Sequence, residues 1–257
     1  MPEGLEAEIY RRAAERTVGR TITAVEVDDL QDTADELRAV LPGLTIVGTH
    51  RVGKQVVLDL DDGERLGLHF GMTGRLIVDG ASAIDRLEYA SGRDDPKWDR
   101  LRLDFDDGTH LRVNDPRRWA VFRLDPDLDR LGPDIFDLTP ELLAERLRGR
   151  RAAIKALLLD QGVVAGFGNM IADEVLWQAG VSPHASAATL SDEQLAAIVE
   201  AAQTNLPEML ERGGSHTGVI DPEVRATLPP CPRDGGPLRR DTVGGRTTIW
   251  CPVHQTA

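Results

Sequence analysis

The spacing of apolar and polar residues changes character along the chain. Residues 5–17 place Leu5, Ile9 and Ala13 among charged residues, which predicts an amphipathic helix. Short apolar segments follow, separated by turn residues such as the two Asp-Asp-Gly sequences, and they predict β-strands. The predicted strands are 21–27, 44–51, 55–60, 65–70, 75–78, 101–105, 110–113 and 120–124. Their regular spacing is typical of a two-sheet β-sandwich.

The pattern becomes helical after about residue 125. The segment 124–134 is rich in Asp, Pro and Gly and predicts a linker. Helices are predicted over 140–149, 152–161, 169–180 and 191–214, the last starting at Ser191 with Glu193 nearby as a capping pair.

From Pro229 the chain returns to short strands around Gly244-Gly245, a favourable hairpin turn. We therefore predict an α+β fold in three parts. They are an N-terminal helix with a β-sandwich over 1–125, a helical domain over 126–228 and a β-hairpin over 229–257.

The composition narrows the class of protein. Hydrophobic residues make up 41% of the 257 residues, which argues against a disordered chain. No apolar run approaches the about 20 residues of a membrane span, and the N-terminus is charged where a signal peptide is apolar. We expect a cytoplasmic protein without a membrane partner. Two cysteines cannot form a disulfide framework.

The net charge of −13 weighs against nucleic-acid binding, which normally goes with excess positive charge. Binding needs only a local basic patch, however, and the basic residues gather in 115–119, 146–155 and 237–246. All but three of the 30 basic residues are arginines, which suit bidentate phosphate contacts. Specific motifs must therefore decide the question.

The C-terminal hairpin carries two pairs of candidate metal ligands. Cys231 and Asp234 are separated by two residues, as are Cys251 and His254, and the pairs flank the Gly-Gly turn. Such pairs can converge on one tetrahedral, structural zinc ion per chain, which would stabilise a module with little core. The alternative is two reduced cysteines near a frayed tail.

This C-terminal segment resembles the zinc finger of the formamidopyrimidine-DNA glycosylase and endonuclease VIII family. The family finger has four cysteines at the same spacing, and here Asp234 and His254 replace the second and the fourth. Arg246 matches the finger arginine that reaches DNA beside the lesion. Without the resemblance, Arg246 would be interpreted as a solvated residue after a turn.

The segment 163–187 is similar to the family's helix–two-turns–helix motif. Gly166 and Gly168 allow close backbone approach, and a helix N-terminus, which can bind phosphate, follows at Asn169. The resemblance assigns Asn169 to a phosphate beside the damaged nucleotide, although it could simply cap the helix. Lys155 matches a family lysine near the DNA face, and we assign it to DNA binding.

The N-terminus, with Pro2, Glu3, Glu6 and Glu8, also resembles the family. It implies that Pro2, once Met1 is removed, has a free amine that attacks C1′ of a nucleotide and forms a Schiff base. Glu3 would transfer protons, and Glu6 would support the site by hydrogen bonding. Taken alone, Pro2 and Glu3 could be no more than a good helix start.

Four further residues match family positions. The resemblance adds Lys54, in a β-hairpin that contacts DNA, to the catalytic set; alone it could be an edge-strand lysine. Met72, Arg117 and Trp119 would fill the space left by a flipped nucleotide, with Trp119 where the family usually has Phe. Core packing for Met72 and Trp119, and a surface ion pair for Arg117, are the alternatives.

Together, the resemblance implies a monomeric DNA glycosylase and abasic-site lyase of base excision repair. It would act on damaged double-stranded DNA and cut the strand by β- and δ-elimination. A non-catalytic damaged-DNA-binding protein of the same fold and an RNA-binding protein are the alternatives. The segment 215–230 is shorter than the loop that covers 8-oxoguanine in the family, so we expect an oxidised pyrimidine, a ring-opened purine or an abasic site as substrate.

Overall fold

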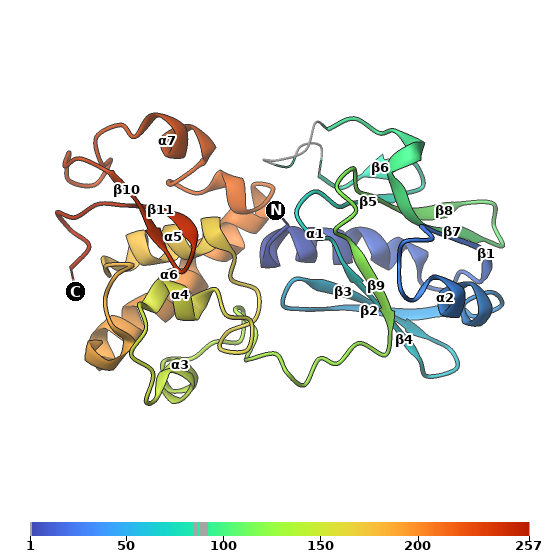
Figure 1. The fold of residues 1–257 in the computed structure, drawn as a ribbon, viewed down its shortest axis with the longest axis horizontal. Helices are drawn as coiled ribbons and strands as arrows, with labels where there is room; N and C mark the ends of the chain where they lie inside the picture. The colour runs from blue at the N-terminus through green and yellow to red at the C-terminus, as the bar shows by residue number, and fades with distance from the viewer. Residues whose placement is uncertain (1, 85–86, 88–91, 257) are drawn as a thin grey trace. The chain divides into compact units, whose positions relative to one another are not determined.

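The computed structural model describes residues 2–84, 87 and 92–256 and confirms the predicted α+β fold (Figure 1). The chain forms two compact units that divide between Leu128 and Asp129, and the short segment Glu3–Leu5 belongs to the second unit by its contacts. Within the described segments, no helix has both the length and the apolar character needed to cross a bilayer.

The first unit is a β-sandwich, as the strand spacing predicted. The five-stranded sheet has the order β1-β7-β8-β5-β6 and the four-stranded sheet the order β2-β3-β4-β9, and all their pairings are antiparallel. The strands are β1 Ile22–Val27, β2 Ile46–Val52, β3 Gln55–Leu60, β4 Arg65–His69, β5 Arg75–Val78, β6 Ala81–Ser82, β7 Asp99–Phe105, β8 His110–Asn114 and β9 Val121–Leu124. Alternate apolar residues of both sheets form one buried core.

Two helices complete this unit. Helix α1, Gly4–Ala14, adds Tyr10 and Ala14 to the core of the sandwich and continues into a 3-10 turn at Glu15–Thr17. Helix α2, Ala34–Val40, was missed because its 7 residues are too few for a helical period to show, although it buries Ala34 and Leu37.

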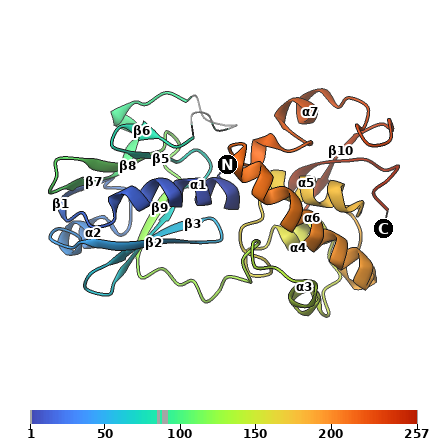
Figure 2. The same cartoon turned by 180° about the vertical axis from the view of Figure 1, so that it is seen from behind.

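The second unit is helical with a terminal hairpin (Figures 1 and 2). Its elements are α3 Pro140–Leu147, α4 Ile154–Leu158, α5 Asn169–Ala179, α6 Asp192–Glu211, α7 Pro222–Thr227, β10 Arg239–Val243 and β11 Arg246–Trp250. Figure 2 shows α6 in front of the unit, where it packs on α5. A small core that includes Trp177, Ile249 and both cysteines lies under the hairpin.

Two details differ from the sequence-based expectation. The start of α6 is a complete capping box, but the partner of Ser191 is Gln194 rather than Glu193. The segment 215–230 is not a plain loop, because it holds a 3-10 turn at Ser215–Thr217 and helix α7. The Asp221-Pro222 start of α7 was a recognisable signal, since Asp221 accepts a hydrogen bond from the Val224 amide.

Candidate active site

Glu3 is held by the N-terminus of α5. Its Oε1 accepts a hydrogen bond from the Met170 amide and its Oε2 one from the Ile171 amide, both at 3.0 Å. The first turn of a helix carries partial positive charge and unpaired N–H groups, so it favours the ionised carboxylate. The free N–H groups that we expected to bind phosphate are therefore partly taken by Glu3.

Two glycines of the motif make this arrangement possible. A Cβ on Gly168 would lie 2.1 Å from Cδ of Glu3, so only glycine fits there. The Gly4 amide donates a hydrogen bond of 2.9 Å to the carbonyl of Gly166, whose φ of +106° suits glycine. The N-terminal residues Glu3 and Gly4 thus contact the glycine turn and the start of α5.

Asn169 does not cap α5, because the N-cap residue is Gly168. The Asn169 side chain is half-buried, and within the described part of the chain its Oδ1 has no hydrogen-bond partner although that atom is buried. An uncommitted amide beside the anchored carboxylate of Glu3 is suited to binding a ligand.

Pro2 and Glu6 are both buried, and Met1 lies outside the described residues. Glu6 lies one turn before Tyr10 on α1, where burial, and then the charge of Glu6, raise the pKa of the Tyr10 hydroxyl. That hydroxyl donates a hydrogen bond of 3.2 Å to the carbonyl of Gly74. Helix α1 therefore connects the N-terminal residues of the site to the turn that carries Met72.

Lys54 lies in the two-residue turn between β2 and β3, behind Gly53, whose φ is +58°. The same turn approaches His69 at the end of β4, since burial, and then the charge of Lys54, lower the pKa of His69. Neutral His69 accepts a hydrogen bond of 3.2 Å at Nδ1 from the Gly71 amide. Lys54 thus belongs to a turn next to the Met72 turn.

A buried aspartate that the sequence analysis missed joins the Met72 turn to the Arg117–Trp119 loop. Asp115 is fully buried at the end of β8. Its carboxylate accepts hydrogen bonds from Thr73 Oγ1 and from the amides of Arg117 (3.1 Å), Trp119 (2.7 Å) and Ala120 (2.8 Å). The two loops also touch directly, because a Cβ on Gly71 would lie 2.6 Å from the Trp119 carbonyl.

This junction presents the three residues that we predicted to fill a vacated base stack. Trp119 is 54% exposed, which does not fit a core residue, and the Arg117 guanidinium lies 5.8 Å from the centre of its ring. Arg117 is exposed and makes no ion pair with any described residue. Met72 is half-buried beside them in the turn.

The four candidate metal ligands converge. One ligand atom each from Cys231, Asp234, Cys251 and His254 lies within 4.8 Å of the others. Asp234 Oδ2 is 2.6 Å from Nδ1 of His254 and 3.3 Å from Sγ of Cys251, so the carboxylate faces both residues.

The surroundings of these ligands also fit a metal. The Nε2 of His254 lies 3.2 Å from the carbonyl of Trp177, to which it can donate a proton, leaving Nδ1 as an electron-pair donor. The Gly236 amide donates to the other oxygen of Asp234 and, as the largest lowering cause, holds the pKa of this carboxyl at about 2. Asp234 therefore places an anionic oxygen beside the lone pair of His254 Nδ1. These two electron-rich atoms repel each other, and a bound cation would remove the repulsion.

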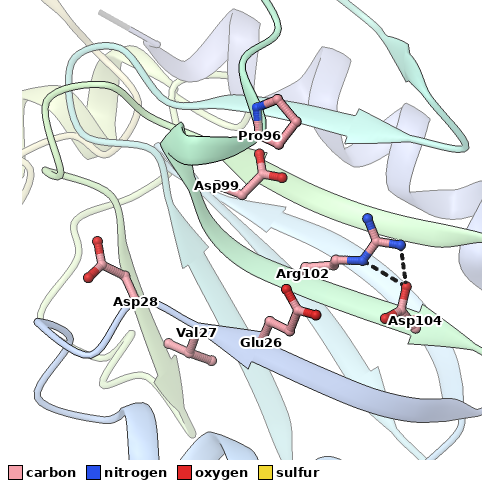
Figure 3. Close-up of a pocket in the computed structure, with 7 residues that line it drawn as sticks. All are labelled: Glu26, Val27, Asp28, Pro96, Asp99, Arg102 and Asp104. Atoms are coloured by element: carbon pink, nitrogen blue, oxygen red, sulfur yellow. Dashed lines mark hydrogen bonds and ion pairs between the residues drawn. The ribbon is translucent and has the colours of Figure 1, made fainter.

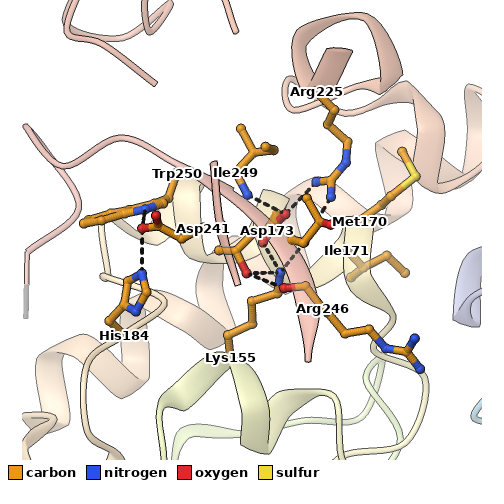
Figure 4. Close-up of polar contacts among 12 residues, drawn as sticks. Lys155, Met170, Ile171, Asp173, His184, Arg225, Asp241, Arg246, Ile249 and Trp250 are labelled. Carbon is orange, nitrogen blue, oxygen red and sulfur yellow. Dashed lines mark hydrogen bonds and ion pairs between the residues drawn. The ribbon is translucent and has the colours of Figure 1, made fainter. Parts of the chain in front are cut away.

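Lys155, which we assigned to DNA binding, does not lie on an exposed face. The residue is fully buried, with Nζ 2.6 Å from Asp173 and donating to Thr247 O (3.0 Å) and Thr248 Oγ1 (2.8 Å) (Figure 4). Burial lowers the pKa of Lys155, and the charge of Asp173 opposes that shift. The sequence signal for this cluster was Asp173, an acidic residue within the otherwise largely apolar helix α5.

Arg246 is exposed at the first position of β11, directly after the Gly244-Gly245 turn, whose φ angles are +57° and +72°. Figure 4 shows its side chain extending away from the buried Lys155 cluster. This orientation suits a contact with a ligand outside the unit.

A pocket of about 380 Å³ in the first unit is unrelated to these residues (Figure 3). Its charged lining is four carboxylates, Glu26, Asp28, Asp99 and Asp104, together with Arg102. Arg102 is already paired with Asp104 at 2.7 Å. Such a lining repels phosphate, so the pocket is not part of a DNA-contact surface.

The site and fold define a protein of the DNA-glycosylase class, and the comparisons with known proteins agree. Residues 1–122 match the formamidopyrimidine-DNA glycosylase N-terminal domain, and residues 131–221 match the helix–two-turns–helix domain of the same enzymes. The chain belongs to the formamidopyrimidine-DNA glycosylase family.

Relatives match along the whole chain. It is 34% identical to a formamidopyrimidine-DNA glycosylase of Chloroflexus aggregans and 33% identical to one of Paracoccus denitrificans, with at least 98% of each chain covered. Among solved structures, the Lactococcus lactis enzyme bound to DNA with an abasic site is 30% identical with a TM-score of 0.83, covering 99% of this chain and 100% of that one. The same enzyme bound to DNA containing Fapy-dG is 29% identical with a TM-score of 0.82, covering 98% and 99%.

Proposed function

We propose that this protein is a bifunctional DNA glycosylase and abasic-site lyase that removes damaged, mainly oxidised, bases through a Schiff base at Pro2. The observation that carries the proposal is the anchoring of Glu3, next to Pro2 in the chain, on the N-terminus of α5. A carboxylate fixed in this way is positioned for proton transfer beside the nucleophile.

The mechanism begins with removal of Met1, which gives Pro2 a free secondary amine. The amine forms a bond to C1′ as the glycosidic bond breaks, and the damaged base leaves with the electron pair of that bond and takes up a proton from water. Glu3, held as the carboxylate, takes the proton that the amine loses and passes it to the sugar ring oxygen as the ring opens. The resulting iminium acidifies the neighbouring carbon, and β- and then δ-elimination expel the 3′ and 5′ phosphates.

Other residues serve binding. Lys54, Asn169 and Arg246 hold phosphates, and Glu6 supports the N-terminal residues. Met72, Arg117 and Trp119 occupy the space left by the flipped nucleotide. Flipping a nucleotide costs the free energy of unstacking its base, and this cost is smaller for a damaged base. Lys155 supports strand β11, which carries Arg246, from within the second unit rather than by contact with DNA.

Zinc fits the four converging ligands of the hairpin. Cys231, Asp234, Cys251 and His254 would hold one ion per chain, and the ion would supply folding free energy to the hairpin rather than chemistry. We further propose a monomer in the cytoplasm, with functional parts at 1–125, 126–228 and 229–257.

The lesion we propose is an oxidised pyrimidine, a ring-opened purine or an abasic site. Segment 215–230, which contains a 3-10 turn and α7, is shorter than the family loop that covers 8-oxoguanine, and this supports the choice. A base-release panel in which 8-oxoguanine opposite cytosine proved the best substrate would contradict this choice.

The decisive experiment is borohydride trapping on a duplex with one abasic site. The expected result is a covalent protein–DNA adduct that falls sharply when one alanine is inserted before Pro2, because the insertion turns the Pro2 amine into an amide and moves the terminal amine one residue further along the chain. Pro2→Gly, which replaces the secondary amine with a primary one, should trap more slowly, and Pro96→Gly at an exposed position should trap normally. Tight binding without any adduct would instead indicate a non-catalytic damaged-DNA-binding protein.

A further inference from the structure

Three charged side chains meet inside the second unit, and the sequence analysis assigned no role to two of them, Asp173 and Arg225. Asp173 of α5 is fully buried, with Oδ1 2.6 Å from Nζ of Lys155 on α4 and Oδ2 2.5 Å from a guanidinium nitrogen of Arg225 on α7. Arg225 itself is only 9% exposed. We call Lys155, Asp173 and Arg225 the charged clamp (Figure 4).

The charged clamp bonds to the backbone of β11 directly behind Arg246. The carbonyl of Thr247 accepts hydrogen bonds from Lys155 Nζ (3.0 Å) and from Arg225 (3.3 Å). The Ile249 amide donates to Asp173 Oδ2 at 3.0 Å. The Thr247 carbonyl and the Ile249 amide are thus both bonded to the charged clamp, and these bonds hold β11 in one register.

Thr248 carries the connection to Arg246 itself. Its hydroxyl accepts from Lys155 Nζ at 2.8 Å and donates to the carbonyl of Arg246 at 3.1 Å. The Gly244 turn before Arg246 also packs closely, because a Cβ on Gly244 would lie 3.0 Å from Cβ of Ala156 on α4. Arg246 is exposed, yet its backbone is fixed on both sides.

The charged clamp also ties β11 to the segment 215–230. Arg225 lies in that segment, and its carbonyl accepts a hydrogen bond from Arg240 of β10. Burying two cations and one anion costs more desolvation than an apolar cluster of the same volume, and such groups are best explained where one geometry must be selected. The geometry selected here is the position of the hairpin relative to α4, α5 and α7.

We propose that Lys155, Asp173 and Arg225 are positioning residues that set the location of Arg246 for its contact with DNA. This inference rests on the proposed function, from which the DNA role of Arg246 comes. Because Arg225 belongs to the segment at the family's base-covering position, the charged clamp couples that segment to the Arg246 contact.

A double-mutant cycle tests the inference with the full chain and a duplex carrying a reduced abasic site. Thr248→Val removes the hydroxyl link without changing any charge, and Arg225→Met removes one arm of the charged clamp. Each should weaken binding about 5-fold in the parent protein and less than about 2-fold when Arg246→Ala is already present, since coupled residues are not additive. Arg225→Lys should weaken binding by less than Arg225→Met. The lysine keeps the charge, but it cannot bond to Asp173 and Thr247 at once as the two nitrogens of a guanidinium do.

Arg112→Met is the matched control. Arg112 is a buried arginine of the first unit, and its ion-pair partners Asp94 and Asp99 belong to the same unit. Its loss should lower the melting temperature, and any effect on binding should be the same with and without Arg246.

The other outcomes are distinguishable. If Thr248→Val and Arg225→Met weaken binding equally in the Arg246→Ala background, the charged clamp serves only stability and the inference is overturned. If Arg246→Ala leaves binding unchanged, the DNA role of Arg246 is wrong and the inference falls with it. If no variant, including the parent, binds the duplex, the proposed function itself fails.

Discussion

At the scale of single residues, Glu3 depends on a helix that begins far away in the sequence. Its carboxylate accepts hydrogen bonds from amides up to 168 positions along the chain. The same residue stabilises the helix N-terminus and, in the proposed mechanism, moves a proton. A test must therefore separate stability from catalysis.

Glu3→Gln keeps one oxygen acceptor and removes the charge. It should lower the free energy of unfolding by about 1–2 kcal/mol, because an NH₂ group now faces a helix N–H. Strand cleavage at an abasic site should be lost while binding of the duplex remains. Urea unfolding and a cleavage assay measure the two effects.

Ser191→Ala is the matched control for Glu3→Gln. It removes the capping box of α6 and should cost about 1 kcal/mol of stability with no change in cleavage. Equal loss of cleavage in both variants would assign Glu3 a structural role only.

At the scale of elements, the Met72 turn and the Arg117–Trp119 loop function as one surface because Asp115 accepts hydrogen bonds from both. Loops without such a junction move independently. The sequence indicated the exposed residues and missed the buried residue that holds them.

Asp115→Asn should loosen this surface, because the amide nitrogen would oppose at least one N–H donor. Excision of a damaged base should fall at least about 10-fold, whereas cleavage at an abasic site should fall less, since no base must be unstacked. Single-turnover rates on the two substrates measure the difference. Asp79→Asn, which alters a carboxylate paired with Arg16 and Arg20, should change neither of the two rates.

The hairpin is the second element whose behaviour can be tested. We expect one zinc ion per chain by elemental analysis, and chelation should lower the melting temperature, because binding energy becomes folding energy at such a site. His254→Ala should abolish the bound zinc, while Asp234→Cys should retain it. The zinc assignment would be contradicted if the parent protein contained no metal and its melting temperature did not change on addition of a chelator.

At the scale of the whole molecule, the net charge of −13 must coexist with DNA binding. Many arginines are already neutralised within the protein, as Arg20, Arg100 and Arg112 are by aspartates. Exposed residues such as Arg117 and Arg246 are then the ones available to phosphates.

DNA binding should weaken as salt rises in spite of this acidic charge. The logarithm of the affinity should fall linearly with the logarithm of the salt concentration, and Arg246→Ala should reduce the slope by about 1, the value for one phosphate contact. Fluorescence anisotropy across a salt series measures the slope. A slope that Arg246→Ala leaves unchanged would show that Arg246 makes no phosphate contact.

The sequence by itself determined the strands, the longer helices and the ligand pairs of the hairpin. These features depend on local spacing: alternation in β7 and β8, helical periodicity in α5 and α6, and paired ligands around a turn. Helices α2 and α7 were missed because they have too few residues for a periodic pattern to emerge.

Only the tertiary structure decided which polar residues are exposed and which are partners. Lys155 and Arg246 are both basic residues in Arg-rich segments, yet one is buried against Asp173 and the other faces outward. Asp115 resembles any other acidic residue in sequence, and the position of Asp173 in an apolar helix does not identify its partners. Their roles arise from contacts between residues distant along the chain, and burial makes those contacts strong because unpaired charges cannot remain in the interior.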